Sequence, residues 1–129
     1  MTISPHLRRL SFVFFWLWLV LIIYLMIRPA DGLPIINIPG FDKIVHFVLF
    51  STLGFLYYAQ QIPRKAIIKR YKKNPGFYLL LLFSLGIEFL HLYLDYRSFE
   101  LLDIVTNGLS LLFGIFGIKF LLQAFFKSI

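Results

Sequence analysis

The chain has 129 residues, of which 60% are hydrophobic and 15% are charged, and its formal net charge is +7. So many apolar side chains leave too little polar surface to cover a water-soluble globule, which indicates an integral membrane protein built as a single domain over residues 1–129. There is no cysteine, so disulfides, thiolate metal sites and cysteine nucleophiles are excluded. In a membrane protein, basic residues report orientation and contact with lipid. We therefore expect membrane lipids, and no nucleic acid, as partners.

Four apolar stretches follow one another along the chain, over residues 10–27, 44–62, 76–94 and 104–122. Each is close to the roughly 20 residues that cross a hydrocarbon core as an α-helix. Clusters of proline, glycine and charged residues separate them. The first stretch is long for a signal-peptide core and no cleavage site follows it, so we expect a retained helix. The sequence therefore predicts an all-α membrane protein, a bundle of four transmembrane helices.

The basic residues are distributed unevenly between the segments that join these stretches. Ten of the 13 lie before the first stretch, between the second and third, or near the C-terminal end, and only Arg28, Lys43 and Arg97 fall on the other side. The positive-inside rule then places both termini in the cytoplasm, an N-in/C-in topology. The acidic residues all belong to the outer half or the outer loops: Asp31, Asp42, Glu88, Asp95, Glu100 and Asp103.

Polar side chains recur at helical spacing on the second and third stretches. Asp42 and His46 lie one turn apart on one face, with Lys43 beside them, and Glu88 and His91 share a face of the third stretch. A charged side chain within the hydrocarbon costs about 2.5 to 3.5 kcal/mol on insertion scales, so such residues normally face a polar cavity. These positions are therefore candidates for a functional site.

The fourth stretch adds Asp103 and Asn107, again one turn apart. They reach a depth in the membrane similar to that of His46 and Glu88. The polar side chains of the three helices can therefore find hydrogen-bond partners only if their polar faces meet. We predict one shared polar pocket in the outer leaflet, with Arg97 of the preceding loop close to it. The first stretch has no polar stripe, and we expect a peripheral packing helix that carries no chemistry.

The same residues also have structural explanations. Asp42 and Asp103 suit the N-terminal ends of helices, whereas Glu88 and Asn107 suit buried pairs that specify helix packing. Small residues are expected where helices pack closely, at Gly54, Gly108, Gly114 and Gly117.

These motifs resemble the VanZ-like family, named for a protein linked to teicoplanin resistance. The resemblance runs from Asp42 to Gly114. It rests on Asp42-Lys43-Ile-Val-His46, Leu53-Gly54, Glu88, Arg97, Asp103-Ile-Val-Thr-Asn107-Gly108 and Gly114. It implies a small multi-pass protein of a bacterial plasma or inner membrane, a role in the cell envelope and an effect on glycopeptide susceptibility. The family pattern usually has Gln where this chain has His91.

Two functions are open at this point. In the first, the outer site binds an anionic lipid or a cell-envelope precursor, and Lys43 and Arg97 hold the anion. The further binding residues expected for this function are Asp42, His91 and Asn107.

In the second function, the chain is a membrane-embedded enzyme acting on a lipid-linked substrate. His46 serves as acid or base, and Glu88 or Asp103 orients it. No serine or threonine lies in a recognisable nucleophile motif, so enzyme activity stays open. Glu88-x-x-His91 also has the spacing of two metal ligands on one helix face, which His46 and Asp103 would complete. Because the resemblance implies Gln at position 91, we expect no metal and no cofactor.

Overall fold

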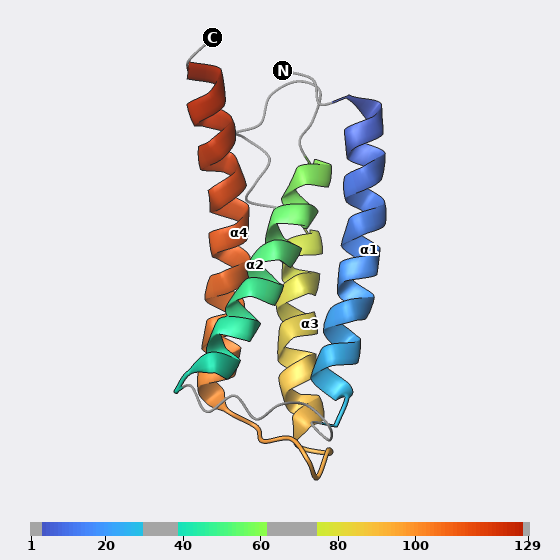
Figure 1. The fold of residues 1–129 in the computed structure, drawn as a ribbon, viewed down its shortest axis with the longest axis vertical. Helices are drawn as coiled ribbons and strands as arrows, with labels where there is room; N and C mark the ends of the chain where they lie inside the picture. The colour runs from blue at the N-terminus through green and yellow to red at the C-terminus, as the bar shows by residue number, and fades with distance from the viewer. Residues whose placement is uncertain (1–3, 30–38, 62–74, 128–129) are drawn as a thin grey trace.

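The computed structural model describes residues 4–29, 39–61 and 75–127. They form four α-helices (Figure 1): α1 (Pro5–Ile27), α2 (Phe41–Gln61), α3 (Pro75–His91) and α4 (Leu101–Lys127). The described ranges contain no β-strand. The prediction of an all-α fold is confirmed, and each helix contains most of one predicted stretch.

The ends of the helices differ from the predicted ones by a few residues. α1 begins five residues early because the Ser4 hydroxyl accepts a hydrogen bond from the Leu7 backbone N–H at 3.3 Å and a proline occupies the first helical position. α3 ends three residues before the predicted position 94. The backbone N–H groups of Leu92, Tyr93 and Leu94 bond to carbonyls three residues back, at 3.0 to 3.3 Å, which tightens the chain out of the α-helix.

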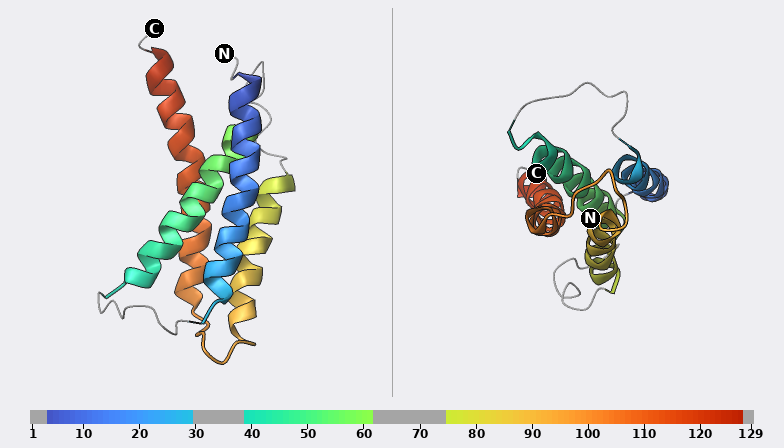
Figure 2. Two further views of the ribbon diagram at one scale, coloured as in Figure 1. Left: turned by 45° about the vertical axis from the view of Figure 1, so that its right-hand side comes forward. Right: turned by 90° about the horizontal axis from the view of Figure 1, so that it is seen from below.

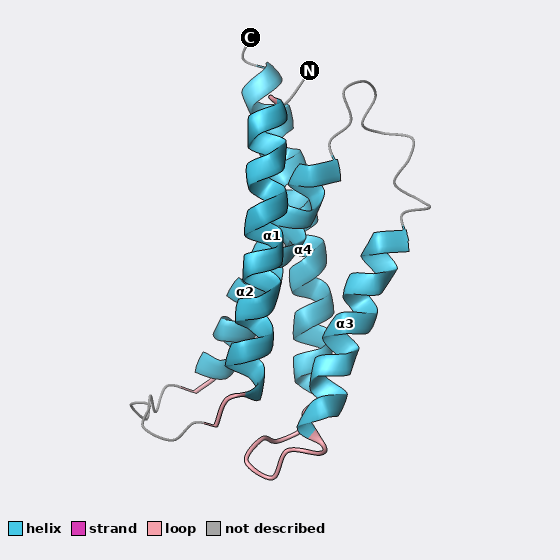
Figure 3. Ribbon diagram, turned by 90° about the vertical axis from the view of Figure 1, so that its right-hand side faces the viewer, coloured by secondary structure: helices cyan, strands magenta, loops and turns pink. Residues whose placement is uncertain are grey.

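The helices lie side by side, with both chain termini at one end of the bundle (Figure 1). The C-terminal ends of α1 and α3 and the N-terminal ends of α2 and α4 meet at the opposite end. α2 is tilted and lies between α1 and α4 (Figure 2), and α3 occupies one edge of the bundle (Figure 3).

α2 and α4 pack with their backbones in contact at two glycines. A Cβ added to Gly54 would overlap a carbonyl oxygen of α4, and one added to Gly114 would overlap a carbonyl oxygen of α2. Their lack of a side chain permits this close approach. The predicted close packing is wrong for Gly108 and Gly117, because nothing lies within 4 Å of a Cβ at either position.

α1 is attached to α2 by packing and by one side-chain hydrogen bond. The indole N–H of Trp18 donates to the Leu49 carbonyl oxygen at 2.9 Å, and Ile22 and Phe50 are fully buried in the core that the two helices share. Trp16 is 51% exposed. α1 therefore packs at the periphery, as predicted.

The outer faces of all four helices are apolar. Leu17 on α1, Ile44 on α2, Leu82 on α3 and Phe116 on α4 are each more than half exposed. The buried polar residues, by contrast, lie between the helices: His46, Ser84, Glu88, His91, Asp103, Asn107 and Ser110. Such a distribution is the reverse of that in a water-soluble bundle and suits a lipid environment.

Two helices of the described ranges are long and apolar enough to cross a membrane by length and composition, namely α1 and residues Leu101–Leu121 of α4. α3 is apolar but has 17 residues. That is roughly 25 Å of helix, against a hydrocarbon core of about 30 Å. α2 carries polar residues at both of its ends. The four crossings and the N-in/C-in topology therefore stay predictions.

Candidate functional site

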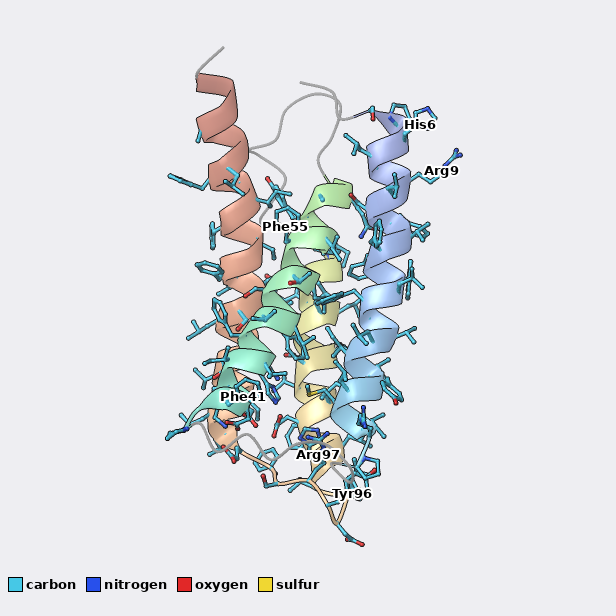
Figure 4. All side chains as sticks on the ribbon, viewed as in Figure 1. His6, Arg9, Phe41, Phe55, Tyr96 and Arg97 are labelled. Atoms are coloured by element: carbon cyan, nitrogen blue, oxygen red, sulfur yellow. The ribbon has the colours of Figure 1, made fainter. Side chains whose placement is uncertain are left out.

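The polar faces of α2, α3 and α4 meet at the end of the bundle opposite the termini. Figure 4 shows Phe41, the first residue of α2, and Arg97, which follows α3, at this end, whereas His6 and Arg9 of α1 lie at the other. We call the four buried residues brought together here the polar cluster: His46, Glu88, Asp103 and Asn107.

His46 lies at the centre of the polar cluster. Its Nδ1 is 2.8 Å from Oδ1 of Asn107, and its Nε2 is 3.8 Å from Oδ2 of Asp103. The ring lies nearly parallel to that of Phe50 one turn further on, at an interplanar angle of 14°. An amide oxygen opposite Nδ1 makes this nitrogen the donor. The neutral ring therefore directs the Nε2 lone pair toward Asp103.

Glu88 contributes a fully buried carboxyl from α3. Its Oε1 accepts a hydrogen bond from the Glu100 backbone N–H at 3.1 Å and lies 3.4 Å from Nδ1 of His91. Its Oε2 is buried and has no hydrogen-bond partner in the part of the chain that the structure describes. One ligand atom each of Glu88, His46 and Asp103 lie within 4.8 Å of one another. A carboxyl in such surroundings must either carry a proton or be paired with a cation.

Lys43 lies at the mouth of the polar cluster, ahead of the apolar stretch 44–62. Its Nζ is 2.8 Å from the Asp42 carboxylate, 2.5 Å from that of Glu100 and 2.5 Å from that of Asp103. Burial lowers the pKa of Lys43, but the hydrogen bonds to these three carboxylates raise it above its usual value. An ammonium has three donors, and each is matched here. The predicted role of Lys43 in holding an external anion does not fit this geometry.

Arg97 lies at the end of α1. Its guanidinium Nη2 donates to the carbonyl oxygens of Leu25 at 2.9 Å and Arg28 at 2.8 Å, and the Tyr96 hydroxyl donates to that of Ile27 at 2.6 Å. The last turn of a helix leaves such carbonyls without partners inside the helix. The sequence predicted Arg97 close to the shared pocket. In the structure its guanidinium instead binds the C-terminal end of α1.

His91 also connects α3 to α1. Its Nε2 lies 3.2 Å from the Met26 carbonyl oxygen, and its Nδ1 faces Glu88. The ring of His91 therefore lies between Glu88 and the end of α1. α1, which was predicted to carry no chemistry, contributes backbone carbonyls that position both His91 and Arg97.

Glu100 belongs to the site although the sequence analysis did not select it. Its backbone N–H bonds to Glu88, its carboxylate pairs with Lys43, and its carbonyl oxygen accepts from the Asp103 N–H at 3.1 Å. The spacing of three residues between Glu100 and Asp103 places both at the start of α4 and was a usable signal. The backbone bond to Glu88 had no signal in the sequence.

The fold and the site define a helical bundle with the apolar exterior of a membrane protein and a buried cluster of ionisable groups at one end. A family model described as VanZ/LLP1 matches residues 6–123, and the chain belongs to the VanZ-like family. It is also similar to an uncharacterized protein of the fission yeast Schizosaccharomyces pombe, at 31% identity over 105 residues. No solved structure matches the chain.

The alignment with the yeast protein covers 81% of this chain and 59% of that protein, so the chain spans little more than half the length of this relative. A relative in a fungus also means that similarity alone does not indicate a bacterium. The predicted bacterial plasma or inner membrane, and the predicted effect on glycopeptide susceptibility, therefore stay predictions.

Proposed function

We propose that this chain is a multi-pass membrane protein in which the polar cluster acts on the polar part of a membrane lipid or of a lipid-linked envelope precursor. One observation carries the proposal. His46 is held by Asn107 beside the buried carboxyls of Glu88 and Asp103, inside a bundle whose outer faces are apolar. Ionisable groups are costly in such surroundings, and they mark functional sites in membrane proteins.

In this proposal all four helices cross the bilayer, with both termini in the cytoplasm. Exposed apolar side chains on every helix support it. Beyond α3, Leu92, Tyr93 and Leu94 continue the apolar surface, and Tyr93 is 84% exposed, as suits a residue at the membrane interface. The polar cluster then lies toward the outer face of the membrane.

The geometry supports acid–base chemistry better than direct binding of an anion. Lys43 is already engaged by three carboxylates. Nη2 of Arg97 donates to two carbonyls of α1, while the buried Nε of Arg97 has no hydrogen-bond partner among the described residues. An anion entering the polar cluster would also meet the carboxyls of Glu88 and Asp103. His46, in contrast, has a ring nitrogen that is free to exchange a proton, and Asp103 lies where it stabilises the protonated ring.

The topology is tested by cysteine labelling, because the chain has no cysteine of its own. Single substitutions Arg9→Cys and Ser98→Cys are treated in intact cells with a membrane-impermeant maleimide. Ser98→Cys should react from outside, and Arg9→Cys should react only after the cells are opened. Labelling of Arg9→Cys in intact cells would overturn the orientation.

The role of His46 is tested with His46→Gln, which retains a polar side chain but cannot act as acid or base at neutral pH. Thr106→Val is the matched control, because Thr106 is a half-buried neighbour of Asn107 whose hydroxyl donates to the Leu102 carbonyl of its own helix. In a bacterial host, the wild type and Thr106→Val should change teicoplanin susceptibility. His46→Gln should lose the effect at equal abundance in the membrane. If His46→Gln behaves as the wild type does, the proposal is wrong.

A further inference from the structure

We propose that His46, Glu88 and Asp103 hold one divalent first-row metal ion, with the chemistry of Zn²⁺, at the end of the bundle opposite the termini. The three residues come from α2, α3 and α4 and are at most 6% exposed. The site does not depend on the acid–base role proposed above for His46. The bound ion would replace that role, because Nε2, the ring nitrogen that Asn107 leaves free, would then be a metal ligand.

Each of the three side chains has one polar atom held by the protein and a second one left over. Nδ1 of His46 bonds to Asn107, Oδ1 of Asp103 pairs with Lys43, and Oε1 of Glu88 accepts from the Glu100 backbone. Metal ligands are typically oriented in this way, with the outer atom of each ligand fixed by a second partner. The atoms left over are Nε2 of His46, Oδ2 of Asp103 and Oε2 of Glu88.

The spacing of these groups suits a metal ion. Bonds of about 2.0 to 2.2 Å in a tetrahedral site place neighbouring ligand atoms roughly 3.4 Å apart. Nε2 of His46 lies 3.8 Å from Oδ2 of Asp103, too far for a hydrogen bond. One ligand atom from each of the three residues falls within 4.8 Å of the others. Binding of an ion would draw these atoms from 3.8 to 4.8 Å toward the roughly 3.4 Å of a tetrahedral site.

A second, independent observation is that the atoms facing this site are hydrogen-bond acceptors without matching donors. Oε2 of Glu88 has no hydrogen-bond partner although the residue is completely buried. Nε2 of His46 and Oδ2 of Asp103 are both acceptors when the ring is neutral, so they do not satisfy each other. A cation satisfies all three atoms at once. It also balances the charge of two buried carboxyl groups, of which Asp103 pairs with Lys43 and Glu88 has no lysine or arginine partner among the described residues.

Two other candidate sets of ligand residues are less suited to a metal ion. Asp42, Glu100 and Asp103 also bring ligand atoms together, but the Lys43 ammonium already occupies the space between them. The Glu88-x-x-His91 pair considered from the sequence fails because, among the described residues, His91 belongs to no set of three side chains whose ligand atoms lie close together. The sequence predicted no metal because of the residue at position 91. The set of His46, Glu88 and Asp103 does not include that position.

One imidazole and two carboxylates favour Zn²⁺ or Mn²⁺ over Ca²⁺, which takes six to eight oxygen ligands. Three protein ligands leave a coordination position open. A bound dication turns an acidic cluster into a place where a phosphate oxygen can bind. The expected ligand class is therefore a phosphate-bearing lipid or precursor, and this last step alone rests on the proposed function.

The test uses the full chain purified in detergent, stripped with a chelator and titrated with Zn²⁺ alone. The wild type should retain one ion per chain after dialysis, measured by elemental analysis, and Zn²⁺ should raise its Tm. Glu88→Gln and Asp103→Asn keep the shape of each side chain and should lower the affinity at least tenfold. The control Asp95→Asn removes an exposed carboxylate outside the cluster and should bind as the wild type does.

Two results would overturn the metal site: a wild type that retains no ion, or equal binding by Asp95→Asn and Glu88→Gln. If Glu88→Gln does not fold, Asn107→Leu replaces it. Asn107 is not itself one of the three ligands but holds Nδ1 of His46, and its loss should weaken Zn²⁺ binding by about 10- to 100-fold. Binding is measured without lipid, so its failure leaves the proposed function standing. Normal Zn²⁺ binding that phosphatidic acid in nanodiscs does not strengthen would overturn the ligand class alone.

Discussion

Nδ1 of His46 lies 2.8 Å from Oδ1 of Asn107, although the two residues are 61 positions apart in the chain. They belong to α2 and α4, the helices whose backbones approach each other at Gly54 and Gly114. The position of the imidazole relative to the amide is therefore set by packing between two backbones. Such a contact determines which ring nitrogen carries the proton.

The first prediction concerns this proton. Nitrogen NMR of the wild type should show His46 with Nδ1 protonated and Nε2 free, because the amide oxygen accepts from Nδ1. Asn107→Leu should abolish this preference and lower the free energy of unfolding by about 1 to 3 kcal/mol, since it leaves a buried donor unsatisfied. A wild-type ring protonated at Nε2 would contradict the assignment.

The second prediction concerns the contact between α2 and α4. Gly54→Ala and Gly114→Ala should each lower the free energy of unfolding by about 1 to 3 kcal/mol, because the new methyl group overlaps a backbone carbonyl that cannot move independently of its helix. Gly108→Ala and Gly117→Ala are the controls, since each adds the same methyl group in open space. Thermal unfolding in detergent measures all four variants. Equal losses in the two pairs would show that α2 and α4 do not pack in this way.

The third prediction separates a structural role of Arg97 from a role in binding. Arg97→Met should weaken the end of α1 by about 1.5 to 3 kcal/mol, because it removes charge-assisted hydrogen bonds to the Leu25 and Arg28 carbonyls. Hydrogen exchange at residues 24–28 should become faster. Arg28→Gln removes a cation from the same end but leaves these bonds intact, so it should have little effect. Zn²⁺ retention should be unchanged in both variants, and its loss in Arg97→Met would place Arg97 in the site after all.

The fourth prediction concerns Lys43. Lys43→Met should lower the free energy of unfolding by about 3 kcal/mol, because it leaves the buried Asp103 carboxylate without its lysine partner. Losses of about 3 to 5 kcal/mol are typical when one partner of a buried pair is removed, and the partial exposure of Lys43 places this loss at the lower end. Asp42→Asn is the control, because Asp42 is an exposed partner of the same ammonium and its loss should lower the free energy of unfolding by less than about 1 kcal/mol. Denaturation of the two variants measures both losses, and equal losses would contradict the pairing of Lys43 with Asp103.

The number of helices and the relationships within each helix follow from the sequence. Apolar stretches separated by proline and glycine predict four helices, and a period of 3.6 residues places Asp103 and Asn107 on one face of α4. Short connections make consecutive helices run in opposite directions. The polar starts of α2 and α4 therefore reach the end of the bundle where α3 finishes with Glu88 and His91. All of these are local properties, which a chain displays before any two helices meet.

Only the tertiary structure decided which polar groups pair. One residue along a helix turns its side chain by about 100°, so a small rotation or tilt of a helix exchanges one partner for another. Arg97 therefore donates hydrogen bonds to the carbonyls of α1, and the Lys43 ammonium pairs with the protein's own carboxylates. Apart from the pair of Lys43 with its neighbour Asp42, these pairs join residues 57 to 72 positions apart. Their geometry depends on how closely α2 approaches α4, and on backbone carbonyls that no pattern of side chains encodes.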